Sequence, residues 1–104
     1  MAMYDPAHPG ELIRETIDGL REETGKSFTT EHVANGLKTP RKTLHAIING
    51  KQSITPEMAL KLAKAFNTSA EFWMHAQENF ELANARKKTD VKSVRVFWKH
   101  RPAV

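Results

Sequence analysis

Residues 28–50 read FTTEHVANGLKTPRKTLHAIING, and the predicted fold is built around this segment. Thr29 and Thr30 near its start are both suited to cap a helix, because a threonine hydroxyl accepts a hydrogen bond from an N–H of the first helical turn. Apolar residues then recur at the spacing of one helical face. They are Phe28, Val33, Ala34 and Leu37. The pattern predicts a short helix with one buried face.

A second short helix is predicted directly after the first. We expect Thr39 to be its N-cap and Pro40 its first helical residue, where the missing N–H of proline costs nothing. Its inward face consists of Leu44, Ile47 and Ile48. Asn49 and Gly50 are expected to end it. Two short helices joined by a three- or four-residue turn form a helix-turn-helix, and the small Ala34 suits their close crossing.

The outward face of this second helix carries basic side chains. It consists of Arg41, Lys42, His45 and Ala46. Arginine offers a fork of donors that matches guanine O6 and N7, lysine reaches the same atoms, and an alanine methyl contacts that of thymine. We therefore expect these four residues to read base edges in a DNA major groove. Phosphate contacts, which orient a protein without reading sequence, are expected from Thr30, Thr43, Asn49 and Lys51.

Positive charge is clustered in two blocks of the chain. Residues 36–51 carry a net charge of +4 and residues 86–104 one of +6, whereas residues 1–35 carry −4 and residues 52–85 carry −2. Clustered charge of one sign is expected of a protein that binds a polyanion. On charge alone, a solvated basic face with a basic tail is the alternative.

Three further helices are predicted around the motif. Pro9 suits the first turn of one, whose apolar positions are Leu12, Ile13, Ile17 and Leu20. Thr55 and Pro56 open another, with Met58, Ala59, Leu62, Ala63 and Phe66 inward and Asn67 at its end. Thr68 and Glu71 have the spacing of a capping box for a fifth, which carries Phe72, Trp73, Phe80 and Leu82. We expect Phe72 in the core and Trp73 near an interface with a partner.

Five short helices indicate an all-α domain, which we place at residues 1–86 with the helix-turn-helix at about 28–50. Residues 87–104 form a basic tail of different character. In it Val94, Val96 and Trp98 alternate with other residues, which is closer to a period of two than to a helical period. A strand that pairs across a dimer would bury them, and a disordered basic tail is the alternative.

Several classes of function are excluded or disfavoured by composition. With 104 residues the chain has room for one domain, and the absence of cysteine excludes disulfides and thiolate metal sites. No apolar run approaches the roughly 18 residues that cross a membrane, and no signal peptide is evident, so we expect a cytoplasmic protein.

The five histidines lack metal-ligand spacing, and no phosphate loop or nucleophile elbow is present. We expect neither an enzyme nor a cofactor; a purely protein-binding module, with Phe72, Trp73 and Phe80 lining a groove, is a further alternative.

Four motifs in order resemble a known family. Residues 8–11 read HPGE, 47–51 IINGK, 54–60 ITPEMAL and 68–73 TSAEFW. From His8 to about Leu82 the chain resembles the HigA-type antitoxins of bacterial toxin–antitoxin modules, within the lambda-repressor-like group. Lys38 stands where this family often has a turn glycine, and a left-handed backbone costs a non-glycine residue about 1 kcal/mol.

The resemblance implies a homodimer that binds a palindromic operator in its own promoter and represses transcription. It also implies neutralisation of a HigB-type toxin, an mRNA-cleaving enzyme of the RelE-like class. The positions matching the family's recognition helix are Arg41, Lys42 and His45. A stand-alone helix-turn-helix repressor without a toxin partner is the alternative, because both need the same DNA site.

Overall fold

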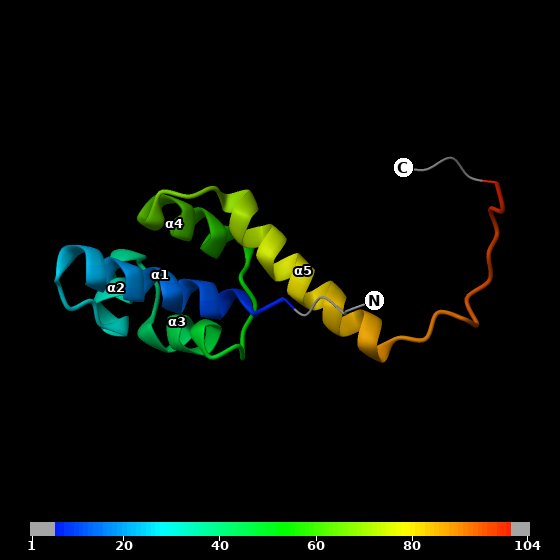
Figure 1. Ribbon diagram of the computed structural model, residues 1–104, viewed down its shortest axis with the longest axis horizontal. Coiled ribbons are helices and arrows are strands. Elements are labelled where there is room, and N and C mark those ends of the chain that lie inside the picture. The colour runs from blue at the N-terminus through cyan, green and yellow to red at the C-terminus, as the bar shows by residue number, and fades with distance from the viewer. Residues whose placement is uncertain (1–5, 101–104) are drawn as a thin grey trace.

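Five helices and no strand make up the part of the chain that the computed structural model describes, residues 6–100 (Figure 1). The helices are α1 (Pro9–Thr24), α2 (Thr30–Gly36), α3 (Arg41–Ile48), α4 (Pro56–Phe66) and α5 (Ala70–Lys88). The predicted all-α, five-helix fold is confirmed. The ends of the predicted domain and tail, residues 1–5 and 101–104, lie outside the described residues.

Side-chain caps begin four of the helices. The ring nitrogen Nδ1 of His8 accepts the Gly10 N–H at 2.9 Å at the start of α1. Of the two candidate threonines, Thr29 caps α2, and Thr55 caps α4 as predicted. Each hydroxyl satisfies an N–H that has no partner inside its own helix. The start of each of these helices is therefore determined largely by the residues next to it in the sequence.

Two predicted caps are wrong. Pro40, not Thr39, is the N-cap of α3, and no side chain caps that helix. Thr39 is buried, and its hydroxyl donates to the Leu37 carbonyl at 3.4 Å. Pro40 is itself extended, with a ψ of 138°, so α3 starts at Arg41. The capping box at Thr68 is also wrong, because Ser69 caps α5 and the Thr68 hydroxyl accepts a bond from the Trp73 indole.

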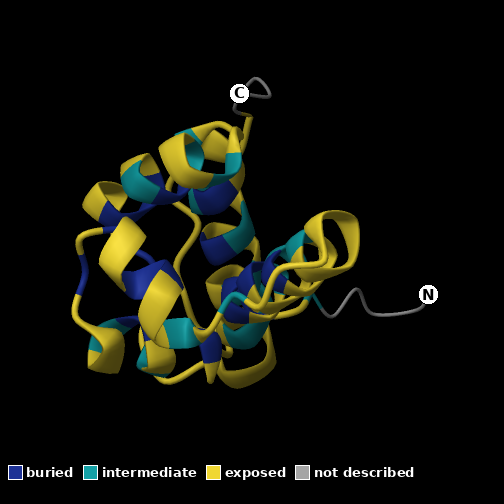
Figure 2. Cartoon of the chain, turned by 90° about the vertical axis from the view of Figure 1, so that its left-hand side faces the viewer, coloured by how far each residue is buried: buried dark blue, intermediate teal, exposed yellow. Residues whose placement is uncertain are grey.

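The core lies where the helices face one another (Figure 2). Its largest fully buried side chains are Trp73, Ile13, Leu44, Ile47 and Leu62. The expectation for the aromatic pair on α5 is reversed: Trp73 is 1% exposed, whereas Phe72 is 47% exposed. The Trp73 indole N–H donates to Thr68 at 2.7 Å, and its ring lies 6.3 Å from that of Phe66. A buried tryptophan needs such a partner for its N–H, and the start of α5 supplies it.

Close backbone packing fixes α3 against α1. A Cβ atom added at Gly10 would lie 2.0 Å from the Ile47 carbonyl oxygen. Only glycine lets the first turn of α1 approach the last turn of α3 in this way. The packing holds α3 at a defined angle, with one face inward and the other outward.

The segment after α5 leaves the helical body (Figure 1). Residues 89–100 form no strand, and their large apolar side chains are exposed. These are Val91, Val94, Val96, Phe97 and Trp98. A strand that pairs across a dimer therefore remains a prediction, since a single chain offers it no partner.

Candidate DNA interface

The outward face of α3 has the composition predicted for it. Arg41, Lys42 and His45 are exposed, Ala46 is half-buried, and the opposite face is packed into the core. Arg41 and Lys42 lie in the first turn of α3, and no acidic residue lies there. An N-terminal end that projects with two long cations is the arrangement a helix needs to enter a major groove. Their contacts with bases remain predictions.

The turn between α2 and α3 is held by Lys61 of α4, which no sequence motif singled out. The backbone of Lys38 is in the left-handed conformation, with a φ of 57°. The Lys61 ammonium, on α4, donates to the Lys38 carbonyl at 3.0 Å and to the Thr39 hydroxyl at 3.3 Å. Three donors on one ammonium allow both bonds at once. The turn that aims α3 is thus tied to α4, and only the three-dimensional fold brings residues 23 positions apart together.

A polar hollow lies where α1, α2 and α3 meet. Arg14, Thr30, His45 and Asn49 contribute to its lining. The Arg14 guanidinium donates to the Asn49 side-chain oxygen at 3.1 Å, and the Asn49 amide nitrogen lies 3.3 Å from His45 Nε2. A chain of contacts from α1 therefore orients the ring that is predicted to read a base.

The predicted phosphate-binding residues do not form one cluster. Thr30 and Asn49 share the hollow with Arg14, a cation that no sequence motif singled out. Thr43 is half-buried and lines a separate hollow beside the segment that leads into α4. Lys51 is exposed just after Gly50, whose φ of 75 turns the chain out of α3. The four residues thus lie at separate places on and around α3, and their contacts with phosphates remain predictions.

His8 is a structural residue rather than a ligand. Its ring meets Phe80 edge to face at 4.7 Å, and it lies beside Gly50 at the end of α3. Burial lowers the pKa of His8 below its usual value, although the carboxylates of Glu11 and Glu81 oppose the shift. The neutral ring is also the form that accepts the Gly10 N–H. His8 therefore joins α1, α3 and α5 in its uncharged state.

Residues 6–100 hold no group of three or more histidine, cysteine or acidic side chains arranged to bind a metal ion. None of the helices described in that range is long and apolar enough to cross a membrane.

A short helix packed across the N-terminal end of a projecting, basic helix is the geometry of a repressor-type helix-turn-helix.

The chain belongs to the helix-turn-helix family, whose model matches residues 21–73. Virulence-associated protein A' of Dichelobacter nodosus is 41% identical over 92% of this chain and 78% of its own length. Other curated relatives are described as helix-turn-helix transcriptional regulators. The family consists of DNA-binding regulators, so the expectation that the chain is not an enzyme is confirmed.

Solved structures confirm the resemblance to HigA-type antitoxins. An antidote protein of the HigA family from Coxiella burnetii superposes with a TM-score of 0.76 at 32% identity, covering 91% of this chain and 100% of that one. The antitoxin HigA of Pseudomonas aeruginosa, solved with the higBA promoter, superposes at 0.68 with 34% identity, covering 80% of this chain and 85% of that one. The chain is thus a helix-turn-helix DNA-binding regulator with the fold of these antitoxins.

Proposed function

We propose that this protein is an antitoxin and autorepressor, which binds a palindromic operator in its own promoter as a homodimer. It neutralises a HigB-type mRNA-cleaving toxin and acts in the cytoplasm. The observation that supports the DNA-binding part best is the exposed, basic first turn of α3, projecting from a packed core. A relative of 34% identity was solved with promoter DNA.

On this proposal α3 lies in the major groove. Arg41 and Lys42 donate to guanine O6 and N7, His45 donates to a base edge, and the methyl of Ala46 contacts a thymine. Phosphate contacts come from Thr30, Thr43, Asn49 and Lys51. We add Arg14 to this second set; the support is that its guanidinium lies in the same hollow as Thr30 and Asn49.

Promoter binding tests the DNA-binding part. The protein is titrated onto a labelled fragment of its own upstream region and onto a scrambled fragment at two salt concentrations. We expect tight promoter binding that salt weakens steeply, with the scrambled fragment weaker by about a thousandfold or more. Equal, weak binding to both fragments would mean that the basic blocks act only as general phosphate binders.

Co-expression tests the toxin-binding part and separates the proposal from a stand-alone repressor. The product of the neighbouring gene is expressed with and without this chain. We expect it to arrest growth alone, to be tolerated with this chain, and to co-purify with it. A neighbour that is harmless and does not co-purify would favour the stand-alone repressor, since both need the same operator.

A further inference from the structure

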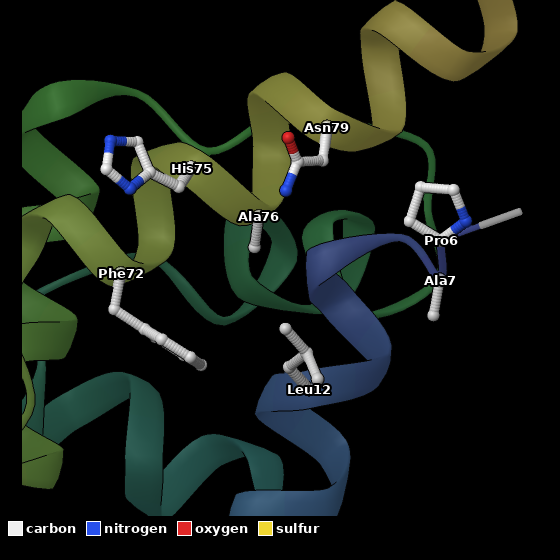
Figure 3. Close-up of a pocket in the computed structure, with 7 residues that line it drawn as sticks. All are labelled: Pro6, Ala7, Leu12, Phe72, His75, Ala76 and Asn79. Carbon is white, nitrogen blue, oxygen red and sulfur yellow. The ribbon is translucent and has the colours of Figure 1, made fainter. Parts of the chain in front are cut away.

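An apolar groove lies between the first half of α1 and the first half of α5 (Figure 3). Its floor is formed by Leu12 of α1 with Phe72 and Ala76 of α5, and the Phe72 ring points toward Leu12. Almost half of the Phe72 side chain is exposed. We call this surface the α1/α5 groove. It lies apart from the outward face of α3.

Exposed acidic residues adjoin the lining residues along both helices, although none of them lines the groove itself, and we call them the acidic borders. Glu11 and Glu15 are exposed on α1, directly before Leu12 and one turn after it. On α5, Glu71 adjoins Phe72 and Glu78 lies one turn after His75, both exposed. Between residues 70 and 85, α5 carries three acidic and no basic residues. The groove therefore favours an occupant that is both apolar and positively charged.

The tail after α5 has this complementary composition. Its apolar side chains are 64–80% exposed, and Phe97 and Trp98 are the most exposed of the large apolar residues. Lys92, Arg95 and Lys99 lie among them. In extended conformation, side chains alternate between two sides, so that Val94, Val96 and Trp98 share one side and Arg95 and Lys99 the other.

We propose that residues 91–99 of a second copy of the chain occupy the α1/α5 groove, and that the two copies exchange their tails reciprocally. Val94, Val96 and Trp98 pack on the floor, while Arg95 and Lys99 pair with the acidic borders. Phe97 lies on the same side of the tail as Arg95, and its ring centre is 5.0 Å from the Arg95 guanidinium. This inference rests on the proposed homodimer and names its interface.

Twofold symmetry favours exchange between two copies over a tail folded back on its own chain. Exchange produces a self-complementary contact, as a homodimer on a palindromic operator requires. A tail folded back would create no contact between copies.

Disulfide trapping tests the exchange directly, because the chain contains no cysteine. Ala76→Cys is introduced into a chain with a large affinity tag and Val96→Cys into one with a small tag, and the mixed proteins are oxidised. We expect a cross-linked species of mixed size on a non-reducing gel. Cysteines at Leu60 and Val96 serve as the control pair, since Leu60 is exposed on α4. Cross-linking of two tails to each other, or of Ala76→Cys to Val96→Cys within one doubly substituted chain, would overturn the proposal.

A charge swap gives a second, independent test by sedimentation. Glu15→Lys with Glu78→Lys, and separately Arg95→Glu with Lys99→Glu, should each raise the dimer dissociation constant by about tenfold or more. Combining all four should restore it to within about threefold of the original. The matched control, Glu22→Lys with Glu23→Lys, changes charge at the far end of α1 and should leave dimerisation unaltered. Unchanged dimerisation in both swaps would contradict the inference.

The two proposals fail in distinguishable ways. If the inference alone is wrong, the wild-type protein binds its promoter specifically and dimerises, but no groove-to-tail cross-link forms. If the promoter-binding proposal is wrong, scrambled and promoter DNA bind alike whether or not the cross-link forms.

Discussion

The helix-turn-helix body and the tail contain the same kinds of residue in opposite environments. Trp73 is 1% exposed in the body, whereas Trp98 is 73% exposed in the tail. The body packs its apolar face against its own helices, and residues 89–100 have no such partner within the described chain. An apolar pattern thus shows that a surface will be covered, but only the fold shows whether this chain covers it.

The two tryptophans allow the strongest test of this contrast. Trp73→Ala should lower the free energy of unfolding by about 3–5 kcal/mol, because it removes a fully buried aromatic and leaves a cavity. Trp98→Ala should change the stability of the monomer by less than about 0.5 kcal/mol. Urea denaturation at concentrations where the protein is monomeric measures both. Similar losses for the two variants would mean that the tail packs on its own body.

A second pair of substitutions separates base reading from phosphate binding. Arg41→Ala should cost about 1–3 kcal/mol on the promoter and much less on scrambled DNA, because on the proposed function it removes donors to a base edge. Lys51→Ala should weaken binding to both DNAs alike and reduce the salt dependence. Titration of each variant onto the two fragments measures the difference. Identical behaviour of the two variants would remove the division of roles between the outward face of α3 and its flanks.

A substitution in the turn between α2 and α3 should have a smaller effect on stability. Lys38→Gly should raise the free energy of unfolding by about 1 kcal/mol or less, because glycine adopts a positive φ without the cost that a side chain incurs. Gly36→Ala is the comparison, since Gly36 lies within α2 at an ordinary φ with open space around it. Thermal unfolding measures both. Destabilisation by Lys38→Gly would show that the lysine side chain itself contributes to the turn.

The smallest expected effect is a dependence of stability on pH. Because burial lowers the pKa of His8 in the folded protein, the unfolded chain takes up a proton first as the pH falls. The stabilising contribution is therefore complete above the unfolded value of about 6.5 and is lost progressively below it. His8→Asn, whose side-chain oxygen is able to cap α1, should flatten this part of the profile. Urea midpoints between pH 5 and 8 measure it, and an unchanged slope in the variant would assign the dependence to another group.

Local signals predicted most of the fold. The paired threonine and proline at residues 55 and 56 placed α4, and the spacing of Leu44, Ile47 and Ile48 placed the inward face of α3. Errors arose where a distant residue decides the outcome. Thr39 satisfied the rules for a cap, yet the left-handed turn carries it into the interior, where Lys61 reaches it from α4.

The candidate site was predicted in part, for the same reason. Arg41, Lys42 and His45 follow from the helical period of a single segment. Arg14 does not, because it is one of several charged residues on α1, and only the packing of α1 on α3 brings it to Asn49. Likewise, neither Phe72 nor Trp73 shows locally which of them faces inward; the bond from the Trp73 indole to Thr68 indicates the outcome.

The central claim is that the outward face of α3 reads the operator base by base. The most direct measurement compares the wild-type protein with Arg41→Ala on a set of promoter fragments, each with one base pair substituted. We expect the wild-type protein to lose about 1–3 kcal/mol at each contacted position and the variant to lose its discrimination at one of them while keeping the others. An unchanged profile of preferences in the variant would contradict the account, since Arg41 would then contact only the DNA backbone or no DNA at all.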